Sequence, residues 1–436
     1  MIKTSPQPSV TKPGSDGNPL SVLNDTVEHG RGRLSMGEGK RSSWKSTETT
    51  AMERYFSTDV LVDILQRLPP SSRRRARLVC RVWRYVLDKR TTEMQSRAKP
   101  LLWHTGNAVA YVVDDPSSAA AASRSCRQLW RSAAKGRNSE AVQLVGTCNG
   151  LLCLCDDEER AGGALTVVNP ATGAKLPVPP LPCAGPLVGS QTQTTEKWSK
   201  METWHEAYCF AYHPTTGKHK AVHVPCSYER VCEFDAVHVL TLGEATWREV
   251  PVGPGGAKCN LAAGIASVDG KTYWIWVTAS GVAKVASFDL EDEHVVVSAT
   301  PRPPAMPPGH SSYHLTEVRG RLGFVTRGHA SAQAWVLEEE GQGWSRRYIL
   351  EQRVPLPHFA YAGECVLTVR DGASFYAHRR KDAASSGRRL RRDEDDGVVR
   401  VGHEDEGRLV VNMGGYVGDY YRTFAYVKTM EPLRIS

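Results

Sequence analysis

The chain has 436 residues, which is enough for two or three domains at roughly 100–200 residues each. Its hydrophobic share of 40% and charged share of 23% are those of an ordinary globular protein, and a net charge of +8 without a dense basic stripe argues against a nucleic-acid partner. No apolar run approaches the ~20 residues that span a bilayer, and the first residues lack the apolar region of a signal peptide. Eleven cysteines, an odd number, favour free thiols in a reducing compartment. We therefore expect a cytoplasmic protein, a nuclear protein or both, with no membrane partner.

Residues 1–50 are rich in Ser, Thr, Pro, Gly and Lys, and their few apolar residues follow no period. Such a segment does not bury enough apolar surface to offset the entropy of ordering the chain. We expect a disordered tail.

Helical periodicity begins after this tail, within residues 52–95. Apolar residues first recur with the spacing of one helix face at Val60, Leu61, Ile64, Leu65 and Leu68, and Pro69-Pro70 ends that helix. The same spacing returns at Leu78, Val79, Val82, Trp83, Val86 and Leu87. The two helices form a hairpin of about 35 residues, which is too small to bury its own apolar faces well. The sequence therefore predicts that the hairpin packs against a partner.

From residue 100 to residue 436 the pattern changes to short β-rich runs separated by turn residues. Examples are LLWH at 101–104, GLLCLC at 150–155, AYCFAY at 207–212, KTYWIWV at 271–277, LGFV at 322–325 and RTFAYV at 422–427. Many short strands at close spacing predict an all-β sandwich, barrel or propeller, and the length of the region favours a propeller.

Turn sequences also suggest degenerate repeats. Gly173, Gly217, Gly270 and Gly320 each follow a run of turn residues and supply the positive φ that tight turns require. NPATGAKLPVP is similar to HPTTGKHKAVHV, SVDGKTYW to EVRGRLGFV, and SFDLEDEHV to AWVLEEEGQGW. We interpret these pairs as the trace of repeated blades.

Residues 378–407 form a charged, low-complexity insert that we expect to loop out between two late strands without contributing to the core. Within it, RRLRR at 388–392 has the composition of a nuclear import signal, but the acidic residues 393–396 neutralise it.

Candidate chemical sites have weak signals. Cys148, Cys153 and Cys155 lack a second pair of zinc ligands, so we interpret them as structural thiols, with Cys153 and Cys155 on one strand face. Four histidines are interpreted as turn and strand residues rather than metal ligands: His205, His213, His219 and His223. Asp289, Glu291 and Glu293 are interpreted as a solvated hairpin turn. With no catalytic or nucleotide-binding motif, we expect no catalytic residue, cofactor or metal.

FSTDVLVDILQRLPPSSRRRARLVCRVWRYVLDKR resembles the F-box. The family's Arg-Leu-Pro is matched by Arg67, Leu68 and Pro69, and its Val-Cys-Lys/Arg-x-Trp by residues 79–83; Tyr55-Phe56 stands where Leu-Pro is usual. The resemblance implies that a Skp-type adaptor, and through it a cullin, binds this segment. The residues it implies for adaptor binding are Leu61, Ile64, Leu65, Leu68, Pro69, Leu78, Val79, Cys80 and Trp83.

GTCNGLLCLC at 146–155 and VVNPATGAKLPVPPLP at 167–182 resemble the opening of the F-box-associated domain of plant proteins, and later segments follow in the family's order. This resemblance implies a kelch-like β-propeller after a small all-α F-box, and the function of a non-catalytic substrate receptor for an SCF-type ubiquitin ligase that binds a protein substrate. Two alternatives are an F-box scaffold outside a ligase and a β-propeller enzyme. For substrate contact, four aromatic residues near strand ends are candidates, although each is equally suited to blade packing: Trp204, Tyr228, Trp247 and Trp344.

Overall fold

The computed structural model describes residues 58–68, single positions 76, 79, 83 and 86, and most of 98–433, with the longest gaps at 115–125, 133–138, 183–202, 380–397 and 414–420. All of these described residues belong to one compact unit, residues 56–436. The expected disordered tail, residues 1–50, lies outside them. None of the helices in the described part is long and apolar enough to cross a membrane.

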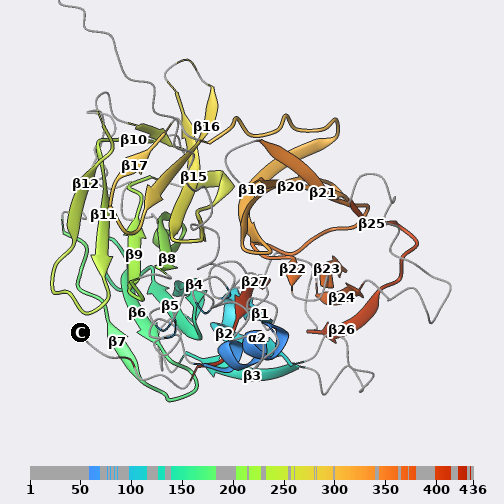
Figure 1. Ribbon diagram of the computed structural model, residues 1–436, viewed down its shortest axis with the longest axis horizontal. Helices are drawn as coiled ribbons and strands as arrows, with labels where there is room; N and C mark the ends of the chain where they lie inside the picture. The colour runs from blue at the N-terminus through green and yellow to red at the C-terminus, as the bar shows by residue number, and fades with distance from the viewer. Residues whose placement is uncertain are drawn as a thin grey trace, which may run out of the picture. The chain divides into compact units, whose positions relative to one another are not determined.

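Six β-sheets follow one another around a ring, which makes residues 99–426 a six-bladed β-propeller (Figure 1). Blade 1 contains β27 (Tyr421–Tyr426), β1 (Lys99–His104), β2 (Val109–Val113) and β3 (Cys126–Arg131). Blade 2 contains β4 (Val142–Cys148), β5 (Leu151–Asp156), β6 (Ala164–Val168) and β7 (Lys175–Pro177). Blade 3 contains β8 (Tyr208–Tyr212), β9 (His219–His223), β11 (Ala236–Thr241) and β12 (Arg248–Pro251).

Of the other three blades, blades 4 and 5 carry additional strands, whereas blade 6 has four. Blade 4 contains β14 (Ala266–Val268), β15 (Lys271–Val277), β16 (Ala283–Asp289) and β17 (Val295–Val296), extended by β10 (Cys232–Phe234) and β13 (Ala257–Cys259). Blade 5 contains β18 (His310–Val318), β19 (Arg321–Gly328), β20 (Ala332–Leu337), β21 (Trp344–Leu350) and β25 (Val399–Val401). Blade 6 contains β22 (Ala360–Tyr361), β23 (Cys365–Arg370), β24 (Ser374–Arg379) and β26 (Arg408–Asn412).

The ring is closed by strands from opposite ends of the β region. The late strand β27 pairs antiparallel with β1, so that Leu101 faces Phe424 across the ladder and Lys99 faces Tyr426. Leu101, Trp103 and Phe424 are buried together with residues of blade 2. This closure removes the sheet edges that an open chain of blades would expose.

The turns that join the first strand of a blade to its second strand confirm one predicted repeat. Asp269-Gly270 and Arg319-Gly320 connect the innermost strands of blades 4 and 5 to their neighbours, with φ of 46° and 77° in the first turn and 53° and 76° in the second. Asn149-Gly150 does the same in blade 2, with φ of 47° and 81°. Two positive φ values in succession define the turn whose twist matches antiparallel strands, and glycine adopts them without strain. SVDGKTYW and EVRGRLGFV are therefore equivalent blade segments.

The likeness between NPATG and HPTTG was wrongly interpreted as a blade repeat. NPATG connects the third and fourth strands of blade 2, whereas HPTTG connects the first and second strands of blade 3. The two turns are alike locally, because the Asn169 Oδ1 and the His213 Nδ1 each accept a hydrogen bond from the backbone N–H three residues later, at 3.3 and 3.0 Å. Local turn chemistry alone accounts for the similarity.

The bounds of the charged insert also need correction. The predicted insert, residues 378–407, begins inside β24, where His378 is buried, and it contains β25. Strand β25 pairs in parallel with β21, and Val401 is 1% exposed in the blade 5 core. Apolar residues at the end of the insert therefore complete a neighbouring blade. The part between these strands, residues 380–397 with the RRLRR run, lies outside the described residues.

Candidate functional site

The helical segment shows which of its apolar side chains pack internally. Helix α2 (Thr58–Arg67) has the predicted amphipathic spacing, and Leu61 and Leu65 on its inner face are 4% and 0% exposed. They pack with Ala76 and Val86 of the second helical stretch. These contacts place Leu61 and Leu65 in the core of the hairpin, and their contact with an adaptor stays a prediction.

A second set of apolar side chains in this segment faces solvent. Val60, Ile64 and Val79 are 47%, 38% and 62% exposed, and they are called the exposed apolar patch below. Leu68 and Trp83 are partly buried against the hairpin core. The predicted adaptor-binding residues thus include both core and surface residues. Val60 was not among them, although helix periodicity placed it on the apolar side and it is exposed. Pro69, Leu78 and Cys80 lie outside the described residues.

The thiols interpreted as structural are buried in the propeller. Cys153 and Cys155 both belong to β5, and both are buried in the core shared by blades 2 and 3, which confirms their common face. Burial raises the pKa of each thiol, and this disfavours the thiolate that metal binding or nucleophilic attack requires. Cys148, at the end of β4, donates a weak hydrogen bond to the Phe210 carbonyl.

The four histidines occupy separate structural positions. His205 Nδ1 lies 2.6 Å from Asp157 Oδ2, and its backbone N–H donates to the same carboxylate, which joins blade 2 to the short helix before β8. Burial opposes protonation of His205, but hydrogen bonds to Asp157 and Glu206 outweigh burial and raise its pKa. His213 caps a turn, while His219 and His223 begin and end β9. Among the described residues no three potential ligands converge on a metal site.

The acidic hairpin turn differs from its prediction. Glu293 was interpreted as solvated, but its carboxylate accepts hydrogen bonds from Lys220 Nζ at 2.6 Å and from Arg248 Nη2 at 2.6 Å. Lys220 is 5% exposed and also donates to the Leu290 carbonyl. This ionic contact connects blade 4 to blade 3, because its acid and its two bases come from adjacent sheets.

Three of the four aromatic candidates are packing residues. Trp204 and Trp247 are buried in the core of blades 2 and 3, and Trp247 Nε1 donates to the Pro179 carbonyl at 2.9 Å. Trp344 is partly buried against the core of blades 4 and 5, and its indole donates to the Pro301 carbonyl at 3.0 Å. Tyr228 lies outside the described residues. Trp247 and Trp344 thus form hydrogen bonds with the chain segments that connect neighbouring blades.

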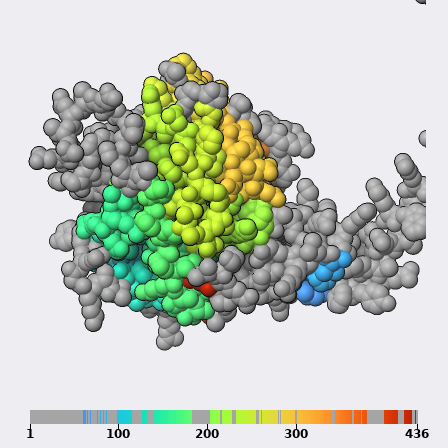
Figure 2. Space-filling view, turned by 90° about the vertical axis from the view of Figure 1, so that its left-hand side faces the viewer, coloured from blue at the N-terminus to red at the C-terminus, as the bar shows by residue number. Residues whose placement is uncertain are grey.

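The two faces of the ring differ in their connections. On one face the innermost strands end in two-residue turns in blades 2, 4 and 5. On the other, which we call the loop face, those strands begin. There the chain includes residues 224–235 and 252–265, which contain β10 and β13, and residues 297–309. Figure 2 shows a side of the ring, with the green surface of blade 2 beside the yellow-green surface of blade 3.

Comparison with known proteins identifies both parts of the chain. A family model described as F-box associated beta propeller domain matches residues 115–379, and a model described as F-box-like matches residues 58–91. F-box protein At3g07870 of Arabidopsis thaliana is 26% identical over 330 residues, covering 68% of this chain and 73% of that protein. F-box protein At2g43440 of the same plant is 25% identical over 319 residues, covering 67% of this chain and 66% of that protein.

Among solved structures, TolB from Acinetobacter baumannii aligns with a TM-score of 0.36 at 8% identity, over 65% of this chain and 60% of that chain. The propeller model alone spans more than half of the chain, and the F-box-like match coincides with the helical hairpin. The chain belongs to the family of F-box proteins in which an F-box-like segment precedes an F-box associated β-propeller domain.

Proposed function

We propose that this chain is the substrate-recognition subunit of an SCF-type ubiquitin ligase. Its F-box-like segment would bind a Skp-type adaptor, and through it a cullin, while the propeller would bind a protein substrate. The observation that carries the proposal is the exposed apolar patch of Val60, Ile64 and Val79, located on the segment that matches the F-box-like model. When a partner covers apolar side chains that are exposed in the free chain, their removal from water stabilises the complex.

In this proposal the chain acts by proximity and performs no bond chemistry itself. Holding a substrate on the propeller raises the effective concentration of its lysines near the ubiquitin carrier, which other ligase components supply. Such a receptor would act in the cytoplasm, the nucleus or both.

We place substrate contact on the loop face. The turns of the opposite face are short in blades 2, 4 and 5, because two-residue hairpins leave little chain for a binding surface. Longer connections can vary in sequence without disturbing the packing between blades. Trp204, Trp247 and Trp344 hold such connections in place rather than offering themselves to a substrate.

Reconstitution of the full chain with a Skp-type adaptor, a cullin and a co-purified partner tests this function. We expect ubiquitylation of the partner by the full chain. A chain lacking residues 58–91 should retain the partner but lose both adaptor and ubiquitylation. Adaptor binding without ubiquitylation of any bound partner would favour a scaffold instead. Loss of the partner upon deletion of 58–91 would contradict the division of roles.

A further inference from the structure

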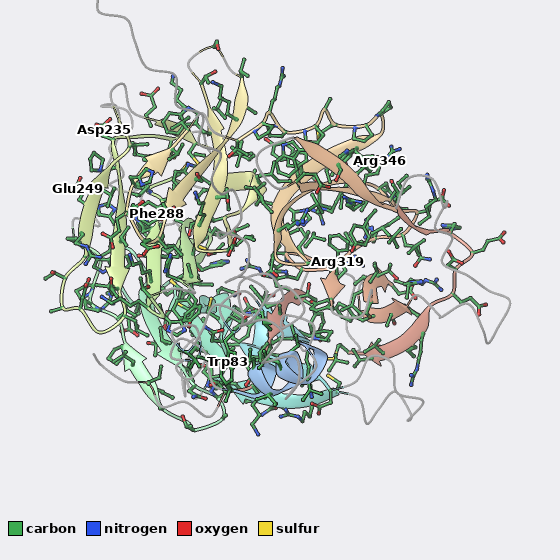
Figure 3. The ribbon with its side chains drawn as sticks, viewed as in Figure 1. Trp83, Asp235, Glu249, Phe288, Arg319 and Arg346 are labelled. Atoms are coloured by element: carbon green, nitrogen blue, oxygen red, sulfur yellow. The ribbon has the colours of Figure 1, made fainter. Side chains whose placement is uncertain are left out.

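Three cysteines meet where blade 3 adjoins the extension of blade 4. Cys226 follows β9, Cys232 begins β10, and Cys259 ends β13. The three belong to one apolar cluster with Phe288 of β16, which Figure 3 labels together with Asp235, the residue directly after β10. These thiols are separated by up to 33 residues in sequence, and folding brings them together.

Strand register places two of these thiols opposite each other. Cys232 pairs with Cys259 in the antiparallel ladder of β10 and β13, so both side chains point to the same side of this two-stranded ladder. The next pair, Glu233 and Lys258, points to the other side and forms an ion pair of 2.5 Å on the surface. The alternation therefore decides which side of the β10–β13 ladder faces the cluster.

Cys226 completes the group from the neighbouring blade. Its Sγ donates a hydrogen bond to the Cys259 carbonyl at 2.8 Å. Interaction with Cys232 lowers the pKa of the Cys226 thiol, but the hydrogen bond to Cys259 and burial outweigh it and raise that pKa to about 12. Cys226 and Cys259 are both 0% exposed, whereas Cys232 is only partly buried. One thiol of the group can therefore meet a small solute from solvent while a second thiol lies in contact behind it.

We propose that Cys232 and Cys226 are an oxidation site, at which a hydroperoxide converts the two thiols into a disulfide. The Cys232 sulfur attacks one peroxide oxygen, the O–O bond breaks, and the departing oxygen takes a proton and leaves as water or an alcohol, giving a sulfenic acid. The Cys226 thiol then attacks the Cys232 sulfur, its proton passes to the departing hydroxyl, and the S–O bond breaks with release of water. The two thiols lose two electrons in total, and the peroxide gains them.

The disulfide would tie β10 covalently to the chain that leaves β9. Because the paired strands β10 and β13 lie on the loop face, oxidation would fix one part of that surface against blade 3. Because the Cys226 and Cys232 side chains interact in the reduced protein and belong to one cluster, the backbone needs little movement to reach disulfide geometry. This inference stands on the thiol geometry alone and does not depend on the proposed ligase function.

Peptide mapping of the full chain tests the assignment directly. The reduced protein is treated with hydrogen peroxide, blocked with an alkylating agent and digested with trypsin without reduction. Cleavage after Lys220, Arg230 and Arg248 separates Cys226 on residues 221–230 from Cys232 on residues 231–248, while Cys259 lies on residues 259–271. We expect a peroxide-dependent link between the first two peptides. A link from 231–248 to 259–271 in its place, or no link at all, would overturn the proposal.

Cysteine variants separate the two steps. In Cys226→Ser, dimedone labelling of Cys232 should rise several-fold, because the sulfenic acid no longer has its condensing partner. Cys126→Ser is the matched control, because Cys126 is also partly exposed but packs against the core of blades 1 and 6, in a different cluster from Cys232. This variant should form the disulfide at the wild-type rate. Unchanged dimedone labelling in Cys226→Ser would show that Cys226 does not act on Cys232.

Discussion

Replacing Ile64 and Val79 together by alanine should weaken adaptor binding while leaving the propeller intact. Their side chains are 38% and 62% exposed in the free chain, so roughly half of their surface remains to be covered. Complete burial of such a side chain is worth about 1.5–3 kcal/mol, and half of that is about 1 kcal/mol for each residue. The double variant should therefore lose about 2 kcal/mol, which corresponds to a Kd about 30-fold higher.

Titration calorimetry of the purified full chain with a Skp-type adaptor measures this loss. Met306→Ala is the surface control, because Met306 is 44% exposed in the propeller and should leave the Kd unchanged. Leu65→Ala is the core control. Its side chain is 0% exposed, so its truncation should lower the unfolding free energy by about 2–5 kcal/mol. Wild-type affinity in a folded Ile64→Ala/Val79→Ala variant would refute the assignment of the exposed apolar patch to the adaptor.

Three further predictions concern the propeller. Lys220→Ala should lower the unfolding free energy by about 2 kcal/mol, because it removes a buried cation that donates to Glu293 and to the Leu290 carbonyl, although Arg248 still pairs with Glu293. Lys271→Ala, which removes a 45% exposed cation from its ion pair with Asp289, should cost at most about 1 kcal/mol, and equal losses in urea unfolding would contradict the buried contact. Gly150→Ala should lower the Tm far more than Gly173→Ala: both have positive φ, but a Cβ at Gly150 would lie 2.5 Å from a carbonyl oxygen after β27, and one at Gly173 meets nothing within 4 Å. Burial raises the pKa of Glu317 from 4.5 to about 7, so the folded state retains a proton that the unfolded state loses. The unfolding free energy should therefore fall as the pH rises between these two values, and thermal unfolding of Glu317→Gln should lack this pH dependence.

Local patterns explain how far the sequence predicted the fold. The period of Leu61 and Leu65 found the helix and its inner face, and alternating apolar runs found the strands. Asp269-Gly270 and Arg319-Gly320 were recognisable because positive φ at two successive residues selects glycine at the second. These features depend on neighbours in the chain, and they are therefore visible in the sequence.

Features that depend on distant residues were missed. Glu293 was interpreted as solvated because its partner Lys220 is 73 residues away in sequence. Strand β25 was hidden in a charged insert, since a three-residue strand is recognisable only by the blade that it joins. The core assignment of Leu65 and the exposed position of Ile64 likewise required the second helical stretch, because periodicity identifies an apolar face but not which of its residues a partner could cover.

The proposed substrate site and the inferred thiol site both lie on the loop face, and the order of the strands explains why. In every blade the second-to-third-strand connection and the link to the next blade lie on the face where innermost strands begin, so a chain insertion there leaves the blade ladders unchanged. Strand β10 arises within the second-to-third-strand connection of blade 3, and β13 within the link to blade 4. Because these two insertions pair with each other, the β10–β13 ladder spans two blades, and Cys226 contacts it from blade 3 through the Cys259 carbonyl. A disulfide between Cys226 and Cys232 would therefore restrict the movement of a surface that the blade ladders do not hold in place. We expect a substrate to bind on that same face.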